Sequence, residues 1–423
     1  MKPLLILPLL LGANFATANA VEPKAGEIVP FKVGDTTRDC ILYTPVSWRE
    51  GSPQKWPVFL SYHGTGGGPT IGLAKRYAGG DAFFLVGMSY SVAGPVPGAT
   101  AQGFYDTEIE NLKAVRDALV EHGGDPSKIY VGGYSKGGWT AGYFADNTPE
   151  LIAGATVMGA GRNPYRQDDL PKYKDKLPIY IGVGTAEVNY QLGHAGIEHW
   201  GSRGADVTFD AYLGYGHVPP VRHRAEYLHQ WFTIQRYKDR KTLLRPIFER
   251  WHDGTRAAAV KAAKEGEHVH AYLLLEHMAS APLAAYLNAT QRKALGGDIA
   301  KLRKHPPVAA ELKQRGFYKR ILDKEVLGGY RLRVWIDVID DYVRIYEAAP
   351  TTVVGKRAIA DAQRLLHAMR TSVRPEKRPM VESFMSTNKV IVDKIEAAPV
   401  NDLNEELRKL GAFLNEDRSA AGE

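Results

Sequence analysis

The chain has 423 residues, of which 44% are hydrophobic and 24% charged, a composition typical of a folded globular protein and not of a disordered one. Its length suits two domains, and the single cysteine, Cys40, excludes an intrachain disulfide. The net charge of +7 arises entirely after residue 240, in a segment with 31 Lys and Arg residues and 24 Asp and Glu residues. This basic half favours either an anionic partner or simply a solvated helical surface. We expect no nucleic-acid partner.

Residues 1–20 have the pattern of a secretory signal. Lys2 is followed by an apolar stretch at 4–11 and by the small-residue motif 18–20, A-N-A. The pattern predicts cleavage after Ala20 and a periplasmic or extracellular mature protein; an N-terminal strand is the alternative. No other run of about 20 apolar residues occurs, so the sequence predicts no transmembrane segment.

Up to residue 240 the sequence alternates between strand and helix patterns. An antiparallel hairpin is expected first, at 28–33 and 40–43, with Cys40 as a buried structural thiol. Further strands are predicted near 56–62, 82–88, 129–133, 152–158, 178–183 and 206–213. Helices are predicted at 106–121, 136–146 and 227–234. This order indicates an α/β fold with a mostly parallel sheet covered on both faces, whose functional loops follow the carboxyl ends of the strands.

After Arg240 the pattern becomes helical. Helical spacing covers 255–276, 283–304, 308–322, 356–369, 380–397 and 404–414, with prolines between the stretches. Residues 330–346 fit both strand alternation and helical spacing, and we predict a helix. The sequence therefore predicts two domains, 21–240 and a helical accessory domain at 241–423, and it contains no motif that indicates the role of the second.

The pentapeptide 133–137, G-Y-S-K-G, has the strongest chemical signal in the chain. It lies between an apolar strand pattern and a helical one, which is the setting in which a G-x-S-x-G motif places a serine on a sharp, strained turn. Gly133 and Gly137 are expected to be crowded by neighbouring backbone. Ser135 is therefore the candidate nucleophile.

A serine hydroxyl needs a base, an orienting acid and donors for the oxyanion. His217 is the candidate base, because it follows the last predicted strand on a loop held by two prolines. Glu187 is the candidate acid after the strand at 178–183, with Asp168 or Asp169 as alternatives.

The oxyanion loop is predicted at 63–68, H-G-T-G-G-G, directly after the first parallel strand. One donor is expected from Thr65 or Gly66, and the other from the backbone N–H of Lys136. An ordinary glycine-rich turn or a phosphate-binding loop are the alternatives. A phosphate loop would continue with Lys and Ser or Thr, whereas Pro69 follows here.

Residues 27–240 resemble the α/β-hydrolase superfamily. The matching segments are His63-Gly64, 125–130, 133–137, 184–187 and Gly216-His217. Within the superfamily, the chain resembles secreted esterases related to dienelactone hydrolases, polyhydroxybutyrate depolymerases and feruloyl esterases. Those families usually have Asp where Glu187 stands, and Ala, His or Gln at Lys136. Only the backbone N–H of Lys136 is needed, so we assign no role to its side chain.

Together these residues predict a secreted serine hydrolase of carboxylic esters that needs no cofactor and no metal. Tyr134 and Trp139 are candidate substrate-binding residues, and the loops at 91–103 and 159–176 are expected to border a rather open site. Two alternatives remain. A prolyl-oligopeptidase-like peptidase shares the fold, and a binding protein on a disabled hydrolase fold would lack activity. The sequence does not indicate the oligomeric state.

Overall fold

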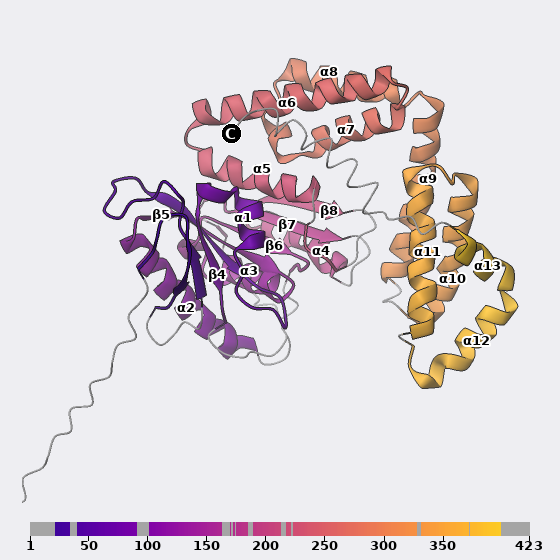
Figure 1. Ribbon diagram of the computed structural model, residues 1–423, viewed down its shortest axis with the longest axis horizontal. Helices are drawn as coiled ribbons and strands as arrows, with labels where there is room; N and C mark the ends of the chain where they lie inside the picture. The colour runs from indigo at the N-terminus through magenta and orange to yellow at the C-terminus, as the bar shows by residue number, and fades with distance from the viewer. Residues whose placement is uncertain are drawn as a thin grey trace, which may run out of the picture.

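The computed structural model describes residues 22–33, 40–90, 101–162, 170, 172–173, 175–184, 189–212, 217–220, 223–327, 331–371 and 373–398. Within these residues the N-terminal half is a sheet covered by helices, and the C-terminal half is helical (Figure 1). No helix in the described ranges has both the length and the apolar character needed to cross a membrane.

The sheet has eight strands in the order β1-β2-β4-β3-β5-β6-β7-β8. Its strands are β1 (Ile28–Phe31), β2 (Cys40–Tyr43), β3 (Trp56–Tyr62), β4 (Phe84–Met88), β5 (Gly124–Tyr134), β6 (Gly154–Met158), β7 (Pro178–Gly184) and β8 (Asp206–Tyr212). Strand β2 is antiparallel to both β1 and β4. The six strands from β4 to β8 in the sheet order, including β3, are parallel to one another. The predicted hairpin and all six further strands are confirmed, and Cys40 is buried in β2. This order is that of the α/β-hydrolase fold.

Helices cover both faces of the sheet because successive side chains of the central strands point to opposite sides. Val58 and Leu60 of β3 share one core with α2 (Ala101–Glu121), α3 (Lys136–Asn147) and α4 (Tyr190–Gly201). Phe59 shares the other core with α1 (Gly72–Ala78) and α5 (His223–Tyr237). Figure 1 shows α5 and α2 on opposite sides of the sheet.

One of the two loops predicted to border the site is shorter than expected. Residues 101–103 already belong to α2, so this helix starts five residues before the predicted 106. The rest of that loop, 91–100, lies outside the described residues, as does most of 163–174 in the second loop.

The C-terminal half consists of helices whose boundaries differ from the predicted ones. They are α6 (Lys241–Lys264), α7 (His268–Ser280), α8 (Ala289–Leu302), α9 (Pro306–Leu327), α10 (Leu332–Ala348), α11 (Val353–Thr371), α12 (Arg378–Thr387) and α13 (Lys389–Ala397), with a 3-10 turn η3 (Pro282–Tyr286). The ambiguous stretch is helical from Leu332 on, as predicted. The expected helix at 404–414 lies outside the described residues.

Three predicted single helices were wrong because local backbone features end them early. Gly266, with a φ of 82°, separates α6 from α7 within the expected 255–276. Asn288 begins α8 with a capping box to Gln291, which divides 283–304. Asn388, with a φ of −109°, separates α12 from α13. Helical periodicity alone does not register such breaks.

These helices form two hydrophobic cores. Helices α6, α7 and α8 share one core with η3, and Ile234 and Tyr237 of α5 pack against it. Helices α9 to α13 form the other, to which α12 contributes Val381 and Phe384. Figure 1 shows the first group over α5 and the second group beside it.

A network of buried charges lies inside the second core. Asp361 and Glu325 are 1% and 0% exposed. Asp361 accepts hydrogen bonds from Arg357, at 3.0 Å, and from the Tyr318 hydroxyl, at 2.6 Å. Arg364 contacts both acids, at 2.8 Å to Glu325 and 3.2 Å to Asp361. Buried carboxylates are tolerated when they are paired in this way, so the network joins α9 to α11.

Candidate active site

Ser135 lies on the turn between β5 and α3, where the sequence predicts it. Its φ of 58° and ψ of −117° make it the one non-glycine residue with positive φ among those the structure describes. Such a conformation costs on the order of 1–3 kcal/mol and persists only where the surroundings impose it. One such contact is the backbone hydrogen bond from Ser135 N–H to the Met158 carbonyl, at 2.8 Å. The side chain is thereby held at the carboxyl edge of the sheet.

The two glycines of the motif are needed because β3 passes close to the turn. A Cβ on Gly133 would lie 2.3 Å from the Tyr62 carbonyl oxygen, and one on Gly137 would lie 2.2 Å from the same atom. Neither distance is compatible with a side chain. The crowding predicted at both positions is confirmed, and it shows that β3, β5 and α3 meet at this turn.

His217 is brought to Ser135 although 82 residues separate them. Its Nε2 lies 2.9 Å from the Ser135 Oγ, which is hydrogen-bonding distance. The imidazole is solvent-exposed, and its ring lies 4.8 Å from that of Tyr134. The loop is anchored three residues later, where the buried Tyr77 hydroxyl of α1 donates to the Pro220 carbonyl at 3.1 Å. Sequence reasoning missed Tyr77, since nothing in a helix pattern identifies which hydroxyl meets a distant loop.

The three candidate acids, Glu187, Asp168 and Asp169, lie outside the described residues. The residues that flank Glu187 are placed. Gly184 ends β7, and Asn189, immediately before α4, donates through Nδ2 to the Gly159 carbonyl at 2.8 Å. The acid therefore stays a prediction.

The predicted oxyanion loop lies against the turn at Ser135. A Cβ on Gly64 would be 3.4 Å from the Ser135 Cβ, so the loop passes directly beside the serine. His63 Nδ1 and the Gly67 N–H both lie within hydrogen-bonding distance of the Gly64 carbonyl, at 2.7 and 3.1 Å. The loop is thus a tight turn, and Thr65 and Gly66 at its tip are exposed.

Lys136 supplies the first amide of α3. Amides in the first turn of a helix have no acceptor within the helix, and they carry the positive end of its dipole. This position suits the stabilisation of negative charge on an atom bound at Ser135. The side chain of Lys136, to which the sequence assigned no role, is buried, at 7% exposed.

The two aromatic candidates for substrate binding lie differently. Tyr134 is half-buried and faces His217 across the ring contact described above. Gly159 allows this ring to fit, because a Cβ there would lie 2.4 Å from it. Trp139 is partly buried and packs against the core between the sheet and α2.

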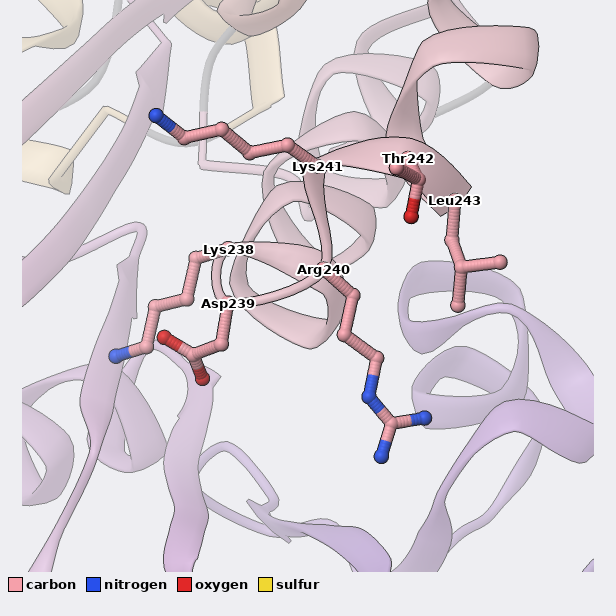
Figure 2. Close-up of a pocket in the computed structure, with 6 residues that line it drawn as sticks. All are labelled: Lys238, Asp239, Arg240, Lys241, Thr242 and Leu243. Carbon is pink, nitrogen blue, oxygen red and sulfur yellow. The ribbon is translucent and has the colours of Figure 1, made fainter.

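A pocket also opens away from this site, at the turn from α5 to α6. It is lined by Lys238, Asp239, Arg240, Lys241, Thr242 and Leu243, whose side chains spread apart around the turn (Figure 2). Its lining holds neither a histidine nor a serine. It therefore lacks both residue types that meet at Ser135 and His217.

Comparisons with known proteins found one curated relative and a number of solved structures. No family model matches the chain. A probable carboxylesterase of Oryza sativa subsp. japonica is 30% identical over 128 residues, which make up 29% of this chain and 54% of that protein. The chain thus spans about half the length of this curated relative.

Solved structures similar to the chain include other esterases. A phospholipase/carboxylesterase from Dyadobacter fermentans matches 51% of this chain and 100% of its own, with 14% identity and a TM-score of 0.38. The Bacillus cereus carboxylesterase matches 47% and 94%, with 18% identity and a TM-score of 0.40. A Pyrobaculum calidifontis esterase matches 51% and 87%, with 16% identity and a TM-score of 0.40. The similarity to carboxylesterases of the α/β-hydrolase type covers the N-terminal half.

Proposed function

We propose that the N-terminal half is a serine hydrolase of carboxylic esters. The observation that carries the proposal is the 2.9 Å contact between His217 Nε2 and Ser135 Oγ on a strained strand-to-helix turn. A serine hydroxyl is a weak nucleophile unless a base accepts its proton. A histidine at this distance is such a base.

The reaction follows from the placement of these groups. Ser135 Oγ attacks the ester carbonyl carbon while its proton passes to His217 Nε2. The carbonyl oxygen becomes an oxyanion, which the Lys136 N–H and an amide of Thr65 or Gly66 stabilise. When the C–O bond breaks, His217 donates its proton to the leaving alcohol, and an acyl group remains on Ser135.

Water then completes the cycle. His217 accepts a proton from the water molecule that attacks the acyl-enzyme, and the carboxylic acid leaves as Ser135 regains its proton. In this proposal Glu187 accepts a hydrogen bond from His217 Nδ1, which fixes the tautomer and stabilises the imidazolium. Side chains and backbone amides perform every step, so no cofactor is required.

The exposure of His217 supports a site that is open to bulky substrates. We infer an acylated polysaccharide, a polyester or a small aryl ester as the substrate class. We further propose that residues 1–20 are a secretion signal, so that the enzyme acts in the periplasm or outside the cell. N-terminal sequencing of protein recovered after export tests this, with Val21 expected as the first residue and Met1 as the contrary result.

Hydrolysis of p-nitrophenyl acetate by the wild type and by Ser135→Ala tests the activity. We expect kcat/KM to fall at least about 10³-fold in the variant, and a fluorophosphonate probe to label only the wild type. Equal turnover in both proteins would exclude Ser135 as the nucleophile. Cleavage of aminoacyl p-nitroanilides in preference to esters would indicate a peptidase, and no labelling or turnover of any substrate would indicate a binding protein.

A further inference from the structure

The side chain of Lys136 turns back into the protein and packs on two aromatic rings. Its Nζ lies 3.9 Å from the centroid of the Tyr90 ring and 4.6 Å from that of Phe104. These are cation–π contacts in a water-poor environment, where such contacts are strongest. Tyr90 follows β4, and Phe104 belongs to α2, so one ammonium joins three elements.

Tyr90 in turn holds the start of the oxyanion loop. Its hydroxyl donates to the His63 carbonyl at 2.8 Å, and its ring meets the imidazole of His63 edge-on at 4.8 Å. Burial raises the pKa of Tyr90, so the hydroxyl keeps its proton and stays a donor. The hydrogen bond is therefore present throughout the pH range in which esters are assayed.

These contacts form a closed circuit around the nucleophile. Lys136 is bonded to Ser135 and contacts Tyr90, and Tyr90 holds His63. Gly64, the next residue, lies beside Ser135, because a Cβ added to it would be 3.4 Å from the Ser135 Cβ. The two amides assigned to the oxyanion lie on opposite arms of the circuit, at Lys136 and after Gly64. The distance between these two amides consequently depends on the contact between the Lys136 ammonium and the Tyr90 ring.

We propose that the Lys136 ammonium and Tyr90 are positioning residues that set the distance between the two oxyanion donors. The inference rests on the proposed esterase function and deepens it. It also reverses the expectation that the Lys136 side chain has no role. A side chain that holds donors in place affects the transition state more than the ground state, because negative charge develops on the oxygen only during attack.

The surroundings of Lys136 explain why a cation can be kept there. Burial lowers the pKa of Lys136, and the fully buried Glu108 of α2 opposes this shift by attraction. Asn111 donates to Glu108 at 3.3 Å. Removal of the Lys136 charge alone would leave Glu108 buried without that attraction, so a test needs a variant that spares the pair.

Tyr90→Phe is that variant, because it deletes only the hydroxyl and leaves the ring under the ammonium. We expect kcat for p-nitrophenyl acetate to fall about tenfold, because the hydrogen bonds of the hydroxyl to the His63 carbonyl and to Thr140 are lost, while KM changes less than twofold. Lys136→Met should lower kcat by a similar factor, and Lys136→Arg, which keeps the charge, should recover most of the loss. The double variant Tyr90→Phe/Lys136→Met should be about as slow as the slower single variant, since both changes open the same circuit.

Lys75→Met is the matched control. Lys75 makes a cation–π contact with Tyr43, at 4.0 Å, on the other side of the sheet from α2, so its loss should leave kcat unchanged. A tenfold fall in this control, an unchanged kcat in Tyr90→Phe, or a hundredfold fall in the double variant would each overturn the inference. Should Lys136→Met not fold, Tyr90→Phe alone decides. Failure of the proposed function is distinct, because Ser135→Ala would then retain the activity of the wild type.

Discussion

Gly137→Ala tests the packing that creates the turn at Ser135. Gly137 lies in α3 and its φ is not positive, so helix propensity alone predicts that alanine stabilises the protein by about 1 kcal/mol. The structure predicts the opposite sign. The new methyl would lie 2.2 Å from the Tyr62 carbonyl oxygen and 2.7 Å from its carbon. Both atoms belong to the backbone of β3, which cannot shift to make room because it is hydrogen-bonded to β4 on one edge and to β5 on the other.

The size of the destabilisation follows from how far the added methyl group overlaps the Tyr62 carbonyl. Real Cβ contacts are not shorter than 3.0 Å, so α3 and β3 must separate by about 0.8 Å. Overpacking of this kind costs about 1–3 kcal/mol, which exceeds the propensity gain. Because Ser135 immediately precedes α3, the same shift would displace Oγ from His217. A displacement near 1 Å costs on the order of 10²-fold in rate, so we expect kcat to fall about 10- to 100-fold.

Urea unfolding, together with p-nitrophenyl acetate hydrolysis, measures both effects. Gly297→Ala in α8 is the control, since it is also a helical glycine but has no neighbouring atom within 4 Å of the added methyl. It should raise the free energy of unfolding by about 0.5–1 kcal/mol and leave kcat unchanged. The reasoning is refuted if Gly137→Ala raises the unfolding midpoint as Gly297→Ala does and retains full activity.

Four further predictions follow from the same structure. His217→Ala should lower kcat/KM for p-nitrophenyl acetate about 10²- to 10⁴-fold with normal folding by circular dichroism; a fall of less than tenfold would exclude it as the base. Tyr77→Phe removes the donor to the Pro220 carbonyl and should lower the free energy of unfolding in urea by about 0.5–1.5 kcal/mol, whereas no change would mean that the loop anchor is unimportant. Asp361→Asn removes the buried carboxylate that pairs with Arg357 and should lower the free energy of unfolding by about 3–5 kcal/mol. Asp393→Asn breaks an exposed pair with Lys389 and should cost less than about 1 kcal/mol. Equal effects of the two changes would contradict the assignment of a buried network. Burial raises the pKa of Tyr62, Tyr77 and Tyr90 above 10.0, so above about pH 10 the native state keeps protons that the unfolded chain releases. The urea midpoint should therefore fall as pH rises above about 10. A constant midpoint up to about pH 11 would show that these hydroxyls are not buried.

The sequence predicted the sheet well because buried parallel strands are nearly continuous apolar runs bounded by glycine or polar residues. The position of Ser135 followed from the same logic, since only a strand followed at once by a helix gives the motif its meaning. Helix ends in the C-terminal half were harder. The breaks at Gly266 and Asn388 depend on local backbone angles, which the spacing of apolar residues does not record.

The contacts that shape the site were the least predictable from the sequence. Tyr90 follows the carboxyl end of β4, a place where functional residues gather, yet nothing in its neighbours identifies His63 as the acceptor. The Lys136 side chain shows the same limit. A lysine in a glycine-rich turn suggests exposure, and its burial results from Tyr90 and Phe104, which arrive from distant parts of the chain.

Helix α5 makes the two halves of the protein structurally interdependent. Leu228 and Trp231 bury one side of α5 against the sheet, while Ile234 contributes to the core of α6, α7 and α8. Polar contacts cross the same boundary. The Tyr227 hydroxyl donates to the His277 carbonyl at 2.6 Å, and the Gln230 side chain accepts from the Leu283 N–H at 3.3 Å. A cut after Arg240 would expose apolar surface on α5 and remove both partners.

This arrangement also links the helical half to the loop of His217. Helix α5 packs against α1 on one face of the sheet, and α1 carries Tyr77, whose hydroxyl holds the loop of His217 through Pro220. Helices α6 to α8 thus support the loop of His217 through two packed layers, α5 and α1. If truncation of the helical half abolished activity, displacement of His217 would therefore explain the loss. A substrate-binding role of the helical half is instead tested by point variants in α6–α13, because these leave α5 covered.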